Sequence, residues 1–433
     1  MVWKKYHLFG IIYLVIMMSK ISKELIEFKK ILEEDEYETY KHEIIEDLNV
    51  DFLIDYVYEN EFFLDDSRHP GYTLHSIEEV LLIAIFALLS NCNTYREIEL
   101  FIKVHYDWLV NKLKLDYGIP SISTIRRVIS IIKPAELETL CNNIFFKFVD
   151  SKGNIYNDGD LVITDIYSLD GKTANGSEVN TINGVIKKIN AMSAYSIKYN
   201  KTLATEFIES KTNEIPTCPK LLSRLNIKDT IITFDALNTQ EKTIKYIYDN
   251  KAHYVAPVKD NHKDFAEELS VYFNDLELLS KCNQYIIEEK SHNKIERREY
   301  YFTNDIDWIT NKSKWSGLKS IGYIRKYNDD KLVEERYFIS DIEAKYVEQL
   351  SKVIRSEWQI ENNLHWYLDT VFKEDSNKSY IKDSQKNLNL IRKFCLGVIK
   401  QIKEEYNLSV NSIRQILGMN FENEIERIFH SLH

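Results

Sequence analysis

Cysteine and glycine are scarce in this chain of 433 residues, with 5 and 12 occurrences. The cysteines are scattered, odd in number and without a CxxC pair, which disfavours a zinc site and is typical of reduced core residues in a cytosolic protein. There is no low-complexity or Pro/Gly-rich tract. With 44% apolar and 28% charged residues, the composition is that of a soluble globular protein whose length allows two or three domains.

A hydrophobic run long enough to span a bilayer is also absent. Residues 1–20 mimic a signal peptide, because a Lys-Lys start precedes an apolar stretch, but no small-residue cleavage site follows. We expect residues 1–17 to be an extension from an upstream start codon, with the natural chain beginning at Met17 or Met18. An export signal is the alternative. No membrane partner and a cytoplasmic location are expected.

The net charge of −11 at first argues against a nucleic-acid partner. The charges are unevenly distributed, however. Residues 33–66 hold fourteen Asp or Glu against Lys41 alone, whereas residues 376–403 hold seven Lys or Arg against Asp383 alone. A basic surface can therefore exist locally, and charge leaves the partner undecided.

The pattern over residues 20 to 150 predicts helices. Residues 76–90 form a mostly apolar segment with Ser76 as the expected N-cap. Residues 118–132 offer a proline, a Ser/Thr cap and then Arg126 and Arg127. This last segment resembles the second helix of a helix-turn-helix, whose exposed basic start could meet DNA. An ordinary capped helix is the alternative.

From about residue 160 the pattern changes to short β-type runs. "LVITDIYSLDG", "INAMSAYSIKYN" and "TLATEFIES" predict three consecutive strands. A predicted helix, strand, helix and strand follow, over residues 218–227, 229–237, 239–251 and 252–261. This order indicates an α/β layer architecture.

Residues 285–340 are again rich in β-type runs and are typical of an inserted antiparallel unit. Two long helices are predicted after them, at about 343–371 and 382–405, followed by a short helical tail.

Three acidic residues stand where a site could form. Asp170 and Asp235 each end an apolar strand, and ligands collect at strand ends in α/β sheets. Taken singly, a strand-final Asp is more often a turn or cap residue, and Glu361 a solvated helix charge. Only the three together favour a site. Four residues fall at four-residue steps along one helical stripe: Glu357, Glu361, His365 and Asp369.

Three convergent carboxylates can hold two divalent cations about 4 Å apart, and such a pair assists in-line displacement at phosphorus. Oxygen-preferring Mg²⁺ or Mn²⁺ suits an Asp/Asp/Glu site. The cations would also offset the repulsion that raises a carboxylate pKa. The stripe of Glu361, His365 and Asp369 is a weaker zinc alternative, because it lacks the HExxH spacing.

Several ordered motifs resemble those of one protein family. They are "DDSRHPGYTLHSIEEVLLIAIFALL" with "PSISTIRRVI", "SLDGKTANGS", "ESKTNEIP", "ITFDALNTQ", "HYVAPVKDNH", "SHNKIERR" and "EWQIENNLHWYLDTVFKED". Over residues 50 to 405 they resemble the DDE transposases of bacterial insertion sequences, in particular the H-repeat-associated group. The last motif is the strongest single match.

The resemblance implies an α/β fold, with a ribonuclease-H-like mixed sheet flanked by helices. It implies a helical, DNA-binding N-terminal domain over residues 18–150 and a catalytic domain over 155–405, with a β-rich insertion at about 275–342. Residues 406–433 would be a helical tail. The catalytic and metal-binding residues would be Asp170, Asp235 and Glu361, holding Mg²⁺ or Mn²⁺, with two ions expected.

The implied activity is metal-dependent cleavage at transposon ends, followed by attack of the freed 3′-hydroxyl on target DNA. The expected partners are double-stranded terminal inverted repeats, target DNA and a second copy of the chain in a homodimeric synaptic complex at the nucleoid. For Trp366, burial against the sheet is the alternative to DNA contact. The residues implied to contact DNA are Lys172, Lys211, Asn213, Lys259, Asn261, Arg298, His365 and Trp366, in addition to Arg126 and Arg127.

Four positions depart from the family pattern. Asn175 stands where Arg is usual, Asn293 where Gly is usual, and Pro257 is expected to interrupt the strand before Lys259. Glu357 occupies a place normally held by His or Arg, where it would repel Glu361 unless a cation or Arg neutralises it. Glu357 and the unusual N-terminus motivate an alternative function, a decayed or repurposed DNA-binding protein that keeps the fold.

Overall fold

The computed structural model divides the chain into two compact units. Unit one comprises residues 1–152 and 381–433, and unit two comprises residues 153–380. The expected start at Met17 or Met18 lies outside the described residues. The structure describes residues 49–60, 64–69, 71, 73–180, 186–208, 214–291, 294–376 and 383–432.

The described part of unit one is helical, as the sequence pattern predicts. Ser76 caps α5, where its hydroxyl accepts a hydrogen bond from the Glu79 N–H at 3.1 Å. Ser121 caps α8, and Arg126 and Arg127 lie exposed in the middle of that helix. The helices are α4 (Val50–Glu59), α5 (Ile77–Leu89), α6 (Tyr95–Val104), α7 (Tyr106–Leu113), α8 (Ile122–Ile131), α9 (Pro134–Phe148), α16 (Ser384–Tyr406), α17 (Val410–Met419) and α18 (Phe421–His430).

The structure groups α16 with unit one, whereas the prediction placed its residues in the catalytic domain. Buried polar contacts explain the grouping. The Asn387 amide donates to the carbonyls of Ile129 and Ile132 at 2.7 and 2.8 Å, and the Arg414 guanidinium donates to the Leu88 carbonyl at 2.6 Å. Such buried groups must keep their partners, so they fix α16 and α17 against the N-terminal helices.

The basic segment 376–403 does not form a simple basic surface. Within it, Arg392 is 0% exposed and Lys393 is 5% exposed. Burial lowers the pKa of Lys400 to about 7. At least part of the positive charge in residues 376–403 is therefore buried where α16 packs.

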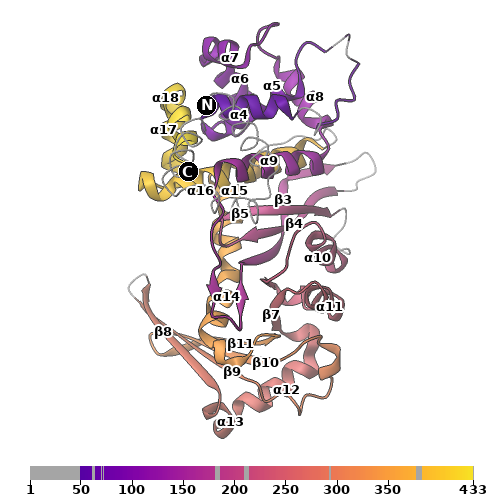
Figure 1. Ribbon diagram of the computed structural model, residues 1–433, viewed down its shortest axis with the longest axis vertical. Helices are drawn as coiled ribbons and strands as arrows, with labels where there is room; N and C mark the ends of the chain where they lie inside the picture. Colours follow the sequence, from indigo (N-terminus) through magenta and orange to yellow (C-terminus); the bar gives the residue numbers. More distant parts are fainter. Residues whose placement is uncertain are drawn as a thin grey trace, which may run out of the picture. The chain divides into compact units, whose positions relative to one another are not determined.

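Unit two is built on a nine-stranded mixed sheet in the order β5-β4-β3-β6-β7-β11-β10-β9-β8 (Figure 1). Strand β4 is antiparallel to both β3 and β5, whereas β6 is parallel to β3, and β7 is parallel to β6. The bounds are β3 (Asp165–Asn180), β4 (Ile186–Ser196), β5 (Lys201–Ile208), β6 (Thr230–Phe234), β7 (His253–Val258), β8 (Asn283–Ser291), β9 (Lys294–Thr303), β10 (Ser320–Asn328) and β11 (Lys331–Ser340). This arrangement confirms the predicted mixed sheet in an α/β fold.

The inserted strands β8 to β11 extend the same sheet. Strand β11 pairs with β7, with Phe338 opposite Pro257, so the insertion continues the core sheet. Pro257 therefore lies inside β7 and does not interrupt it, contrary to expectation. A separate two-stranded pair, β1 (Tyr156–Asn157) and β2 (Val162–Ile163), precedes the sheet.

The predicted helix near 343–371 is confirmed as a helical run from Val347 to Thr370. It consists of α14 (Val347–Ile360), a π-helical turn (Glu361–His365) and α15 (Trp366–Thr370). Helices α12 (Lys263–Asn274) and α13 (Leu276–Ser280) were not predicted. The remaining helices are α10 (Glu214–Leu222) and α11 (Glu241–Asp249).

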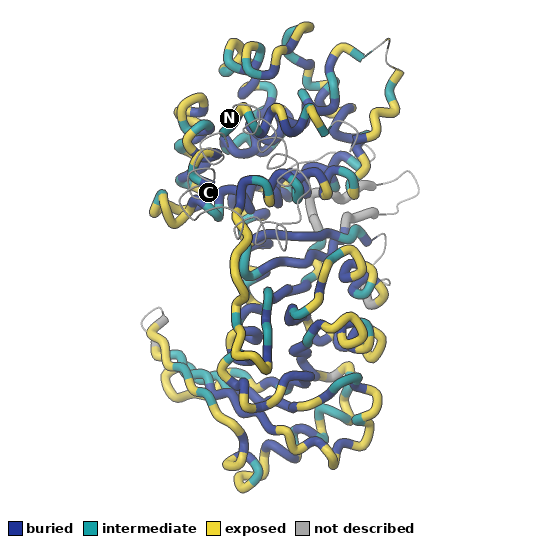
Figure 2. Tube along the Cα trace, viewed as in Figure 1, coloured by how far each residue is buried: buried dark blue, intermediate teal, exposed yellow. Residues whose placement is uncertain are grey.

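Alternate residues of the central strands pack on opposite faces of the sheet. Leu169 and Phe234 belong to a core cluster with residues of α10, α11 and α12, whereas Ile166 and Ile231 belong to a second cluster with Leu350 of α14. Figure 2 shows the central strands buried along most of their length. Since Asp170 and Asp235 directly follow Leu169 and Phe234, alternation directs both aspartates to the α14 face.

Among the residues that the structure describes, no helix has the length and apolar character that crossing a membrane requires.

Candidate active site

Asp170 and Asp235 lie at the same level on adjacent parallel strands. The last paired residues of β3 and β6 are Leu169 and Phe234, so the two aspartates come next on each strand. Neighbouring strands lie about 4.8 Å apart. The sequence pattern placed both residues at strand ends, which is wrong for Asp170, because β3 continues to Asn180. The register of β3 and β6 brings the two aspartates side by side.

The turn after Asp235 is tied to the end of β7. Asp235 accepts a hydrogen bond from the Ala236 N–H at 2.5 Å, and the Asn261 amide donates to the Ala236 carbonyl at 2.7 Å. The Thr239 hydroxyl donates to the Pro257 carbonyl at 2.7 Å. Asn261, expected to contact DNA, thus orients the turn that carries the second aspartate.

Glu361 begins the π-helical turn that interrupts the long helix. The Trp366 N–H donates to the Glu361 carbonyl, five residues earlier, instead of to the residue four positions back. Such turns are rare and occur frequently at functional sites. Here the turn lies on the helix that covers the face to which Asp170 and Asp235 are directed.

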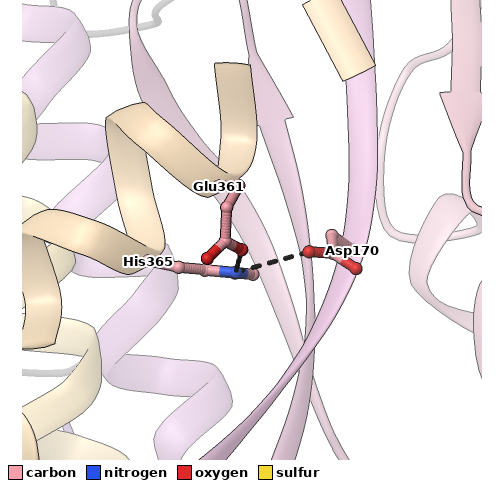
Figure 3. A group of neighbouring side chains, drawn as sticks. All are labelled: Asp170, Glu361 and His365. Atoms are coloured by element: carbon pink, nitrogen blue, oxygen red, sulfur yellow. Dashed lines mark hydrogen bonds and ion pairs between the residues drawn. The ribbon is translucent and has the colours of Figure 1, made fainter. Parts of the chain in front are cut away.

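His365 bridges the helix and the sheet (Figure 3). Its Nδ1 atom lies 3.1 Å from Glu361 Oε2 and 3.3 Å from Asp170 Oδ2, and the residue is only 4% exposed. Ligand atoms of Asp170, Glu361 and His365 all lie within 4.8 Å of one another. The four-residue step from Glu361 to His365 signalled this proximity, although the resemblance assigned His365 to DNA contact.

The cluster has the electrostatics of a cation site. Burial raises the pKa of Asp170 to about 7; the Gly171 N–H opposes this shift, whereas Glu361, Asp235 and Glu357 add to it by repulsion. Asp235 therefore acts on Asp170 electrostatically, although it lies outside the compact group of three. Carboxylate oxygens with one imidazole nitrogen fit Mg²⁺ or Mn²⁺, and a cation would relieve this repulsion.

Glu357, one helical turn before Glu361, is neutralised by an arginine from the inserted strands. The Arg336 Nη2 atom lies 2.7 and 2.6 Å from the two oxygens of Glu357. Burial still raises the pKa of Glu357, and Asp235 adds to this shift, while Arg336 and Lys259 oppose it. Arg336 thus neutralises Glu357, for which repulsion of Glu361 was expected. The sequence pattern did not single out Arg336.

Comparison with known proteins identifies the family. The model described as "Transposase DDE domain" matches residues 168–397, and the model "DDE_Tnp_1-associated" matches residues 63–144. The chain belongs to the DDE transposase family. The domain is that of a nuclease or polynucleotidyl transferase of bacterial insertion sequences.

Two curated relatives of this transposase-family chain come from Escherichia coli. "Putative transposase YncI" of strain O157:H7 is 29% identical over 82% of this chain and 89% of its own. "H repeat-associated putative transposase YhhI" of strain K12 is 28% identical over 80% of this chain and 90% of its own. A cryo-EM structure of a piggyBac transposase synaptic complex with hairpin DNA aligns over 89% of this chain and 78% of that chain, at 11% identity and a TM-score of 0.40. A TM-score this low does not by itself indicate a shared fold.

In this DDE transposase-family chain, Lys172 is engaged within the protein. Its Nζ atom lies 2.5 Å from Asp369 and 2.9 Å from Glu374, which is 3% exposed. Although burial opposes the charge, Glu374 and Asp369 raise the pKa of Lys172. A DNA phosphate would have to displace two carboxylates, so Lys172 fastens β3 to the segment after α15. Asp369 is correspondingly outside the acid cluster.

The other residues expected to contact DNA are dispersed. Lys259 is exposed and close enough to Glu357 to lower its pKa. Arg298 pairs with Glu289 and Glu296 and lines a cavity of about 320 Å³.

Trp366 is 51% exposed, so its alternative burial against the sheet is not observed. Lys211 and Asn213 lie outside the described residues. Arg126 and Arg127 belong to unit one, where their exposure on α8 leaves open both the helix-turn-helix and the ordinary capped helix.

Proposed function

We propose that this protein is a divalent-metal-dependent DNA transposase that cleaves at the ends of its element and joins the freed 3′-hydroxyl to target DNA. The proposal is carried by the convergence of Asp170 and Glu361, with Asp235 on the next strand, into a cluster whose carboxylates repel one another. Family membership supplies the reaction class.

Asp170, Asp235 and Glu361 would hold the cations, and His365 either completes the ligand set or orients Glu361. Bound Mg²⁺ or Mn²⁺ would activate the attacking oxygen and stabilise the leaving oxygen. The rigid elements β3, β6 and the π-helical turn position the acids before DNA arrives, which supports catalysis through preorganisation. No side chain needs to form a bond to DNA, because water or a hydroxyl is the nucleophile.

The proposed partners are double-stranded terminal repeats, target DNA and a second copy of the chain in a homodimeric synaptic complex. Exposed Lys259 beside the acid cluster, and exposed Trp366 one turn beyond Glu361, are the contacts that the geometry favours on unit two.

The alternative, a DNA-binding protein without catalysis, was motivated in part by Glu357. The Arg336–Glu357 pair weakens that motive, because the unusual acid has a bidentate partner. All three acids are retained, which also favours the enzyme.

The test is cleavage of DNA that carries the flanking terminal repeats, by the full-length protein with Mg²⁺ or Mn²⁺. Asp170→Ala, Asp235→Ala and Glu361→Ala should each lower the rate by at least about a hundredfold, because each removes a group that holds the reacting centre. Chelation of the divalent ions should have the same effect.

The matched control is Asp249→Ala, which removes an exposed carboxylate paired with Lys245 four residues earlier. This variant should cleave like the wild type. Wild-type rates in all three site variants would refute the assignment of the acids. Absence of any divalent-ion binding in calorimetry would favour the non-enzymatic alternative.

A further inference from the structure

An ion pair between Arg336 and Glu357 joins the inserted strands to the catalytic helix. Arg336 lies on β11, and Glu357 lies on α14 one turn before Glu361. Both oxygens of Glu357 are within 2.7 Å of Arg336 Nη2, and the two side chains are only 9% and 16% exposed. This is the buried, charge-assisted geometry in which an arginine constrains a carboxylate strongly.

The strand side of the pair is also fixed. Arg336 is paired in register with Ile324 of β10, and its guanidinium lies 4.9 Å from the centre of the Phe338 ring. The cation is therefore held at one place on the sheet, and Glu357 must turn toward β11 to reach it.

The helix side of the pair faces the acid cluster. Asp235 and Lys259 both act electrostatically on Glu357, and Glu357 acts on Asp170. Without Arg336, Glu357 would be a fourth carboxylate beside the three proposed ligands. It would then repel them or compete for their cations, because a buried charge that loses its partner must find another or be neutralised.

We propose that Arg336 is a positioning residue of the active site, which holds the Glu357 carboxylate against β11 and keeps it out of the cation-binding set. This inference rests on the proposed function for its kinetic test. In this proposal the inserted strands supply the positive charge that neutralises the acid at position 357.

A second ion pair on the same helix provides a matched control. Arg355 of α14 contacts Glu289 of β8 at 3.0 and 2.8 Å, so it also ties the helix to an inserted strand. Its side chains are 37% and 43% exposed. Exposed pairs of this kind contribute little to stability. Neither partner is among the main causes of the pKa shifts of Asp170 and Glu357.

The experiment compares cleavage rates of the full-length wild type with Arg336→Met, Arg355→Met and the double variant Arg336→Met/Glu357→Met. Arg336→Met should lower the rate at least about tenfold, which corresponds to about 1.4 kcal/mol of transition-state stabilisation. Arg355→Met should remain near the wild-type rate. The double variant should recover most of the loss, because it removes the carboxylate that Arg336 restrains.

Recovery separates positioning from a merely structural role, since the double variant lacks the ion pair altogether. Arg336→Lys, which keeps the charge, should retain most of the activity if Arg336→Met folds poorly. Unchanged cleavage by Arg336→Met would overturn the proposal, and so would a loss that the double variant fails to restore.

A crystal structure of Arg336→Met at neutral pH supplies a readout independent of cleavage. The Glu357 carboxylate should leave its position beside β11 and turn toward Asp170 or Asp235. If it stays in place, the inference is wrong, even where cleavage has been demonstrated. If wild-type protein cleaves nothing but Glu357 turns in the variant, the proposed function fails and the positioning role stands.

Discussion

At the scale of single residues, the chemistry depends on how the protein handles crowded negative charge. Asp170 is partly buried and repelled by three other acids, so that its pKa rises to about 7. Glu357 is restrained by Arg336, and Lys172 neutralises Asp369 and Glu374. These three acids around the proposed cation site are thus paired with cations, while Asp170 and Glu361 both contact His365.

Because the pKa of Asp170 is raised, we predict that the protein without divalent ions loses folding stability as the pH rises. Between its ordinary pKa of 3.8 and about 7, the folded state binds more protons than the unfolded state, so stability falls as pH rises through this range. Asp170→Asn lacks this charge. Its melting temperature relative to wild type should therefore increase between pH 5 and pH 8, by roughly 2–4 °C.

The check is thermal unfolding of both proteins at the two pH values in the presence of a chelator. Mg²⁺ or Mn²⁺ added at pH 8 should then raise the melting temperature of the wild type but not that of Asp170→Asn, because bound ligand stabilises only the site that holds it. A constant difference between the proteins across pH would contradict the electrostatic account of Asp170.

The three acids were predictable from the sequence, but their charged partners were not. Asp170 and Asp235 end apolar runs, and Glu361 lies in a motif with a family resemblance. Arg336 stands in no pattern that links it to the site, and Glu374 lies in the last motif but was not singled out. Their roles arise from pairing with Glu357 and with Lys172, which lies 202 positions away along the chain, and such pairing becomes visible only in the folded protein.

At the scale of elements, the π-helical turn at Glu361–His365 is the least regular part of the site. It places one additional residue in the helical turn that carries Glu361 and His365. A regular α-helix would present these side chains at another angle to β3. We therefore expect the irregularity to be required for the geometry of the cluster.

Deletion of Asn362, an exposed residue within this turn, tests that requirement. The helix should become regular, with helical content by circular dichroism preserved and cleavage reduced by about a hundredfold, the cost of misplacing a reacting group by roughly 1 Å. Asn362→Ala keeps the residue count and should cleave like the wild type. Full activity of the deletion variant would show that the turn is dispensable.

Strands were easier to predict than this turn. Strand β3 begins with, and β6 consists of, a short buried run with β-branched and aromatic residues, which is typical of strands. The π-helical turn leaves no comparable pattern. Helices α12 and α13 were missed. They lie between two runs of β-type sequence, and those runs alone were assigned.

At the scale of the whole molecule, the chain forms one unit from a continuous segment and another from both ends. Residues 153–380 carry the proposed catalytic residues, and residues 381–433 pack with the N-terminal helices. The expected boundary near residue 405 followed from family resemblance. The contact of Asn387 with Ile129, across 258 positions, was not visible in any local pattern.

The fold, and not the sequence alone, determines which charged residues reach the surface. The seven cations of residues 376–403 suggested a basic surface, yet Arg392 and Lys393 are buried in the packing of α16. On unit two, by contrast, Lys259 remains exposed and lies close enough to Glu357 to lower its pKa. For this protein, the placement of charge therefore says more about its partner than the total of −11.

Anomalous diffraction from crystals containing Mn²⁺ shows whether Asp170, Asp235 and Glu361 hold divalent cations. We predict an anomalous peak at coordination distance from carboxylate oxygens of Asp170 and Glu361, and a second peak about 4 Å away that Asp235 also contacts. Occupied Mn²⁺ sites elsewhere on the protein, with no peak at these carboxylates, would contradict the account.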